Sequence, residues 1–197
     1  ISDMVDTSAY KNILLKEMLA HQAGFTPWIP FYIRTLHKGQ PKFELYSVKQ
    51  SEFFSERVAE NLYAQKGLRD SIFKRILSTK VSPVKKYKYS DIGYYFINEI
   101  IQRKTKTTQD KYVMNSFYKP LGLGNIGYKP RDKWDVDRIP PTEDDKTFRG
   151  QLIQADVHDQ GAAMMGGVCG HAGLFANAND LAVMMQLFMQ YGEYGGE

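Results

Sequence analysis

Serine and lysine residues spaced three positions apart are the first pattern in this chain that could carry chemistry. On a helix this spacing puts both side chains on one face, where the lysine amine can hold or accept the proton of an attacking hydroxyl. The chain contains four such pairs, Ser8/Lys11, Ser71/Lys74, Ser82/Lys85 and Ser116/Lys119. Chance pairs are expected at this composition, so the surrounding sequence has to decide among them.

For three of these serines the local sequence argues against a role as nucleophile. Ser8 falls in a polar stretch that is predicted to be a loop, and Ser82 is followed by Pro83, which favours a turn. Ser116 lies near the end of a predicted helix, beside Pro120.

Cysteine and histidine give weaker candidates. Cys169 and His171 are two residues apart, which pairs a thiol with a base, but neighbours in a glycine-rich turn rarely point at each other, so a small packed cysteine is favoured. The spacing of His158, Asp159 and His171 fits no zinc pattern. His21, at a predicted helix end, is expected to cap the helix or to pack in the core. We therefore expect no metal ion and no cofactor.

Charge and hydropathy limit the partners. The chain has 26 Lys and Arg against 22 Asp and Glu, and its densest basic stretch, residues 85–88, is interleaved with tyrosine and is expected to be a solvated loop, not a nucleic-acid site. No apolar run reaches the roughly 18 residues of a membrane helix. The start has no signal-peptide pattern, and an opening with Ile1 suggests that the chain begins inside a longer protein.

The elements that must position these residues are mostly helical by pattern. Apolar residues at a period near 3.6 predict helices over residues 12–21, 68–77, 92–103 and 179–190, and a capping-box pattern at 107–110 predicts another to about 118. Residues 43–65 fit short strands or helical turns, and residues 126–147 are expected to form a long ordered loop. The predicted fold class is therefore mainly α, with few short strands.

Three segments resemble the serine β-lactamase and penicillin-binding-protein superfamily, nearest to its class C and esterase branch. Residues 19–25 (LAHQAGF) resemble the family's "LLTHTSGL", residues 89–94 (YSDIGY) its "YSN" turn, and residues 170–182 (GHAGLFANANDLA) its "GGLFSTADDLA". Residues 141–143 (PTE) and 157–160 (VHDQ) are similar to a bacterial branch in which such a domain follows a family-3 glycoside hydrolase domain.

The resemblance implies a serine acyl-transfer hydrolase with an α/β fold, of which residues 1–197 would be a partial domain that lacks most of the central sheet. The family's nucleophile stands a few tens of residues before the first motif, whereas Ser8 is too close to that motif and Ser71 follows it. His171-Ala172-Gly173 satisfies "HxG", but the family's pocket-lining strand comes later in the chain. We therefore expect the nucleophile and the strand motif to lie outside this chain, which should be inactive alone.

The resemblance assigns two catalytic residues here, Tyr89 and Asp91. The family's tyrosine exchanges protons with the nucleophile and the leaving group. The ordinary pKa of a tyrosine is about 10, so it must fall by roughly three units, or about 4 kcal/mol, for the tyrosine to act as a base near neutral pH. Without the lysine of the nucleophile helix, Tyr89 should behave as an ordinary phenol. Asp91 stands where the family has an asparagine. The charge of Asp91 could pair with that lysine, or it could weaken the binding of an anionic β-lactam. Alternatively, Ser90 or Asp91 simply caps the helix that begins at Ile92.

The resemblance also implies partners and a location. The parent protein would act on a small-molecule acyl substrate, in the periplasm or cell envelope. A helical subdomain without its sheet should expose an apolar face, through which the chain could dimerise. The alternative is a non-catalytic accessory domain of a larger cell-envelope or glycoside hydrolase protein, in which Asp91 marks a decayed site.

Overall fold

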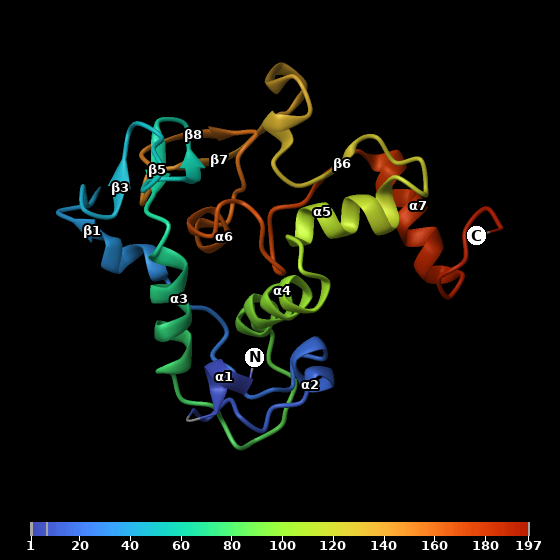
Figure 1. The fold of residues 1–197 in the computed structure, drawn as a ribbon, viewed down its shortest axis with the longest axis horizontal. Helices are drawn as coiled ribbons and strands as arrows, with labels where there is room; N and C mark the ends of the chain where they lie inside the picture. Colours follow the sequence, from blue (N-terminus) through green and yellow to red (C-terminus); the bar gives the residue numbers. More distant parts are fainter. Residues whose placement is uncertain (1, 7, 197) are drawn as a thin grey trace.

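The structure is a computed structural model that describes residues 2–6 and 8–196 (Figure 1). Its α-helices are α1 (Ser2–Val5), α2 (Leu15–Leu19), α3 (Leu68–Leu77), α4 (Ile92–Thr105), α5 (Gln109–Val113), α6 (Gln160–Met164) and α7 (Ala178–Met189). Short 3-10 turns are η1 (Phe31–Thr35), η3 (Pro130–Asp132) and η4 (Val136–Arg138), and a π-helical segment, η2 (Met114–Tyr118), continues α5.

The strands are short and pair in four small antiparallel sheets. They are β1 (Leu36–His37), β2 (Gln40–Pro41), β3 (Tyr46–Ser47), β4 (Glu56–Ala59), β5 (Leu62–Ala64), β6 (Ile126–Gly127), β7 (Pro141–Asp145), β8 (Gln151–Gln154) and β9 (Phe175–Ala176). β1 pairs with β2, β6 with β9 and β7 with β8, and β5 lies between β3 and β4.

The predicted mainly α fold class is wrong. Helices make up 36% of the chain and strands 13%, and the structures that the fold resembles are α/β proteins. Strands of two to five residues are too short to show the alternation that identifies a strand in a sequence. β7 consists of a proline, a threonine and three acidic residues, and all of these except the threonine disfavour strands, so its pairing with β8 had little local signal.

The predicted helices differ in how well they match. α3 has its predicted bounds, α4 begins at its predicted first residue, and α7 is displaced from its prediction by one residue at each end. The first predicted helix is reduced to α2: it begins after Leu14, whose backbone is extended with ψ of 144°, and it ends before His21, which is left-handed with φ of 54°. The predicted capping box is also wrong: Thr108 precedes α5 without a side-chain capping bond, and Gln109 is buried instead.

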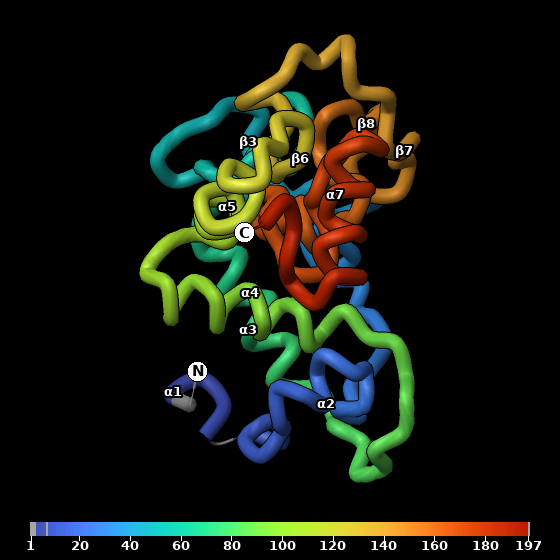
Figure 2. The backbone as a smooth tube through the Cα atoms, turned by 90° about the vertical axis from the view of Figure 1, so that its right-hand side faces the viewer, coloured from blue at the N-terminus to red at the C-terminus, as the bar shows by residue number. Residues whose placement is uncertain are grey.

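α4 runs through the middle of the molecule, between α3 on one side and α5 on the other (Figure 1). Figure 2 shows that the sheet containing β3 and the sheet of β7 and β8 lie at the end of the molecule opposite to α1 and α2. The main core includes the buried faces of α3, α4 and α6 together with β4 and β5. Asn98, a polar residue of α4, is fully buried and donates from its side-chain amide to Oε1 of Gln109.

Within residues 2–6 and 8–196, no helix is long and apolar enough to cross a membrane.

Candidate active site

The Tyr89 turn, residues Tyr89–Ser90–Asp91, leads directly into α4. Its central residue, Ser90, is 4% exposed and makes three hydrogen bonds. The Ser90 amide donates to Nδ1 of His21 at 3.2 Å, and its hydroxyl donates to the Thr26 carbonyl at 2.6 Å. The hydroxyl also accepts from the Ile92 amide at 3.2 Å, whereas Asp91 makes no side-chain capping bond. Ser90 is therefore the residue that fixes the turn and caps the start of α4.

The first motif, residues 19–25, holds the Tyr89 turn from the other side. The His21 carbonyl accepts from the Lys88 amide at 2.8 Å, in addition to the bond between His21 and Ser90. Gly24 has φ of +79°, and a Cβ atom there would lie 2.3 Å from the Ser82 carbonyl oxygen. Only glycine fits this conformation and this close approach. His21 is thus a hydrogen-bond partner of the turn, a role that its sequence position did not indicate.

Tyr89 and Asp91 lie where the turn meets solvent. Tyr89 is 58% exposed, and its ring stands 4.6 Å from the ring of His21. The negative charge of Asp91 is the main cause that raises the pKa of Tyr89 above its ordinary value of 10.0, with smaller effects from burial and from the phenol's hydrogen bond to that carboxylate. A raised pKa disfavours the phenolate, so these residues alone do not prepare Tyr89 to act as a base.

The third motif packs against the first two turns of α4. Gly170 lies so close to the helix that a Cβ atom would stand 2.3 Å from the Tyr94 carbonyl oxygen. The ring of His171 stacks on Tyr95 with centroids 4.5 Å apart and planes 24° apart. Nε2 of His171 lies 2.9 Å from Oδ1 of Asp159, the residue that caps α6. The structure therefore brings all three motifs together around the start of α4.

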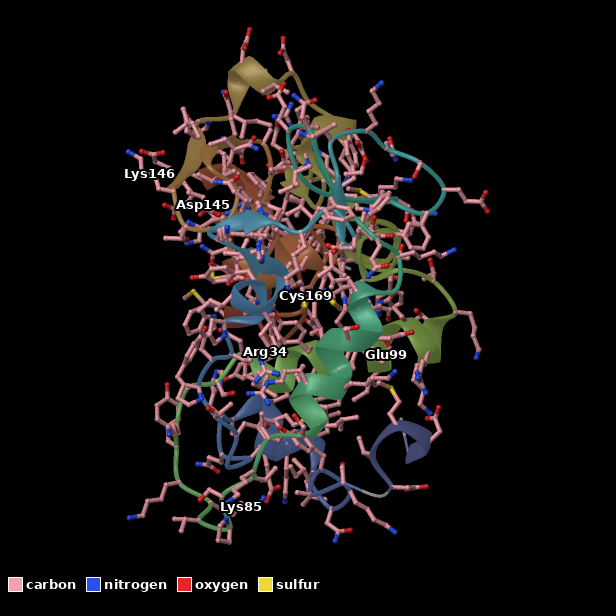
Figure 3. The ribbon with its side chains drawn as sticks, turned by 90° about the vertical axis from the view of Figure 1, so that its left-hand side faces the viewer. Arg34, Lys85, Glu99, Asp145, Lys146 and Cys169 are labelled. Atoms are coloured by element: carbon pink, nitrogen blue, oxygen red, sulfur yellow. The ribbon has the colours of Figure 1, made fainter. Side chains whose placement is uncertain are left out.

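The pair of His171 and Asp159 is charged and largely buried. Burial alone would lower the pKa of His171, but the hydrogen bond to Asp159 and the neighbouring Cys169 raise it from 6.5 to about 10. Burial would raise the pKa of Asp159, but His171 lowers it below 3.8. Cys169 itself is fully buried near the centre of the molecule, as Figure 3 shows, which fits the packed cysteine predicted from the sequence.

The four Ser-x-x-Lys pairs are not assembled as nucleophile and base. Ser71 and Ser116 are exposed on α3 and η2, and the Ser8 hydroxyl donates to the Val5 carbonyl at 2.9 Å. The Ser82 hydroxyl accepts from the Val84 amide. In the part of the chain that the structure describes, no hydrogen bond joins any of these hydroxyls to the lysine three residues later.

A groove of about 580 Å³ lies beside the Tyr89 turn. Residues 24–26, 80–84 and 86–88 supply its walls, including Lys80, Lys86 and Lys88. Three cationic side chains at an open groove favour an acidic ligand group, such as a carboxylate. No set of three or more His, Cys, Asp or Glu side chains in the described ranges is arranged to hold a metal ion.

Comparison with known proteins identifies the family of the chain. The Beta-lactamase family model matches residues 1–194. An Escherichia coli K12 protein provisionally named D-alanyl-D-alanine carboxypeptidase is 32% identical over 203 residues, which cover 96% of this chain and 42% of that protein. The N-acetylmuramyl-L-alanine amidase of Bacillus subtilis 168 is 30% identical over 179 residues, which cover 81% of this chain and 41% of the amidase. The chain thus spans less than half the length of these relatives.

Solved structures show the same fold at low sequence identity. D-amino acid amidase from Ochrobactrum anthropi SV3 matches 98% of this chain and 47% of its own, with a TM-score of 0.59 and 11% identity. The octameric penicillin-binding protein homologue from Pyrococcus abyssi matches 98% of this chain and 39% of its own, with a TM-score of 0.56 and 16% identity. The chain belongs to the Beta-lactamase family, within the serine β-lactamase and penicillin-binding-protein-like superfamily.

Proposed function

We propose that residues 1–197 are a partial domain of a serine acyl-transfer hydrolase, and that this part supplies the tyrosine relay while the nucleophile and the last strand motif lie outside it. The observation that carries this proposal is the convergence of the three motifs on the start of α4. Ser90 is hydrogen-bonded to His21 of the first motif, and the third motif packs on Tyr94 and Tyr95.

In the proposed reaction a serine hydroxyl attacks an acyl carbonyl, and its proton passes through Tyr89 to the leaving group. Water then attacks the acyl-serine ester, and the same relay returns the proton to the serine. Tyr89 needs a lower pKa for this role, and a lysine beside the nucleophile would supply the positive field. Asp91 opposes that field, so we expect it to pair with the incoming lysine.

The substrate class follows from the site and the relatives together. One relative carries the provisional name D-alanyl-D-alanine carboxypeptidase, and another is named N-acetylmuramyl-L-alanine amidase. A peptide that ends in a carboxylate suits the three lysines of the groove beside Tyr89. We infer a small acyl substrate of peptide type and a location outside the cytoplasm, where peptidoglycan is found.

A second function is favoured by one observation. The charge of Asp91 raises the pKa of Tyr89, which is the wrong direction for a base and would suit an accessory domain whose site has decayed. Such a domain would not turn over an acyl substrate, even within its full-length parent.

One pair of variants separates these functions. In the full-length parent, Tyr89→Phe should lower turnover of a chromogenic β-lactam or a p-nitrophenyl ester by roughly 10²–10⁴, the usual contribution of a positioned proton-transfer group. Tyr191→Phe is the matched control, because Tyr191 is a fully exposed tyrosine that lies outside the groove. Equal turnover in both variants, or a parent without any acyl-transfer activity, would favour the accessory domain. The 197-residue chain alone should neither hydrolyse these substrates nor react with fluorescent penicillin.

A further inference from the structure

The hydrogen bond between Asp159 and His171 connects a fixed point in the core to α4. Asp159 is held as the cap of α6, where its carboxylate also accepts from the Ala162 amide at 2.6 Å. α6 in turn packs against β4, within the main core. His171 therefore has an anchored partner on one side and the ring of Tyr95 on the other.

The surroundings of His171 leave it little freedom. Its side chain is 4% exposed, and its Nδ1 has no hydrogen-bond partner among the described residues. The Tyr95 hydroxyl is enclosed as well, since a Cβ atom on Gly161 would lie 2.1 Å from it. A shift of the imidazole would break its bond to Asp159 or separate it from Tyr95. The ring therefore holds α4 at a fixed position relative to α6.

Tyr95 is four residues after Asp91, one helical turn into α4. A helix is rigid over a single turn, so whatever fixes Tyr95 also fixes the residues at its start. We propose that Asp159 and His171 form a buried clamp that positions the Tyr89 turn, which makes His171 a positioning residue for the site. The catalytic consequence rests on the proposed function, whereas the clamp itself does not.

The charge of the clamp depends on few groups. Asp159 faces the imidazole from the cap of α6, Cys169 from the same loop and Tyr95 from α4. His158 acts on Asp159, and Asp91 acts on Tyr95. The imidazolium and the carboxylate favour each other's charged forms, which strengthens the bond between them.

Two measurements on the 197-residue chain test the clamp. The ¹⁵N signals of the His171 ring should show the imidazolium at pH 8, well above the ordinary histidine pKa of about 6.5. Asp159→Asn keeps an oxygen that can cap α6 and removes only the charge. This variant and His171→Phe, which keeps a ring against Tyr95, should each speed amide hydrogen exchange at Ser90–Tyr94 by roughly 10-fold or more.

The controls make each outcome decisive. His37→Gln changes an exposed histidine on β1 and should leave exchange at Ser90–Tyr94 unchanged. The double variant should exchange no faster than the faster single variant, because both changes remove the same ion pair. A neutral His171 at pH 8, or unchanged exchange in Asp159→Asn, would overturn the clamp even if the variants of buried residues fold poorly. Failure of Tyr89→Phe to lower turnover would instead refute the proposed function and leave the clamp standing.

Discussion

Gly170 and the Tyr94 carbonyl oxygen are so close that a Cβ atom at position 170 would stand 2.3 Å from that oxygen. The contact is between two backbones, so a flexible side chain cannot relieve it. Gly170→Ala should therefore push the third motif away from α4 and lower the free energy of unfolding by about 1–3 kcal/mol. Gly67→Ala is the control, because nothing lies within 4 Å of its added Cβ atom. Urea denaturation of both variants measures the difference, and equal stabilities would contradict the close contact.

Asp91 is expected to control the acidity of Tyr89. Asp91→Asn removes the charge that does most to raise the pKa of Tyr89, so that pKa should fall toward 10. NMR of the ¹³Cζ atom of Tyr89 in the 197-residue chain reports the pKa directly. In the full-length parent, the same variant should react faster with an anionic β-lactam, because the family's neutral amide is restored. An unchanged pKa would show that Asp91 does not act on the phenol.

The buried ion pair between Arg149 and Asp145 holds the turn that joins β7 to β8. The two side chains are fully buried, with Nε of Arg149 at 2.7 Å from Oδ2 of Asp145, and Arg149 also donates to the Val157 carbonyl. Arg149→Met strands the carboxylate and should cost about 3–5 kcal/mol of stability. Lys146→Met should cost less than about 1 kcal/mol, because the ion pair of Lys146 with Asp144 is exposed to solvent. Figure 3 shows Lys146 at the edge of the molecule. Thermal or urea denaturation compares the two.

The pH dependence of stability should reveal the same buried charges. The pKa of His171 rises from 6.5 to about 10 on folding, so its contribution is complete below pH 6.5 and is lost as the pH rises toward 10. The pKa values of Asp159 and Asp145 fall below 3.8, so their contributions are lost as the pH falls through those lowered values. The alkaline decline should be smaller in His171→Gln than in the wild type and in His37→Gln, as measured by urea denaturation at a series of pH values.

The sequence predicted the helices better than the contacts between them. α3 and α4 have long apolar stripes, so their periodicity alone located them. The strands could not be recognised in the sequence. β7, for example, is stabilised by its pairing with β8 and by the salt bridge of Asp145, and no local sequence pattern encodes either contact. Tyr89 and Asp91 were found through the motif that contains them, and they remain predictions. The partnership of His171 with Asp159 was missed, although both residues belong to segments that carry the family resemblance; their spacing was tested only against metal patterns.

α7 should be the face through which two copies of this chain associate. Its side chains Phe188 and Met189 are 65% and 80% exposed, and Leu181 and Met185 are each nearly half exposed. Large apolar side chains on one short helix are uncommon on a monomer's surface and favour burial against a partner. Phe188→Ser should weaken both dimerisation, measured by light scattering, and binding of a hydrophobic dye. Val48→Ser is the matched control, because Val48 is 68% exposed and lies outside α7. A wild-type chain that stays monomeric and binds no dye would contradict this prediction, since the exposed face would then need no partner.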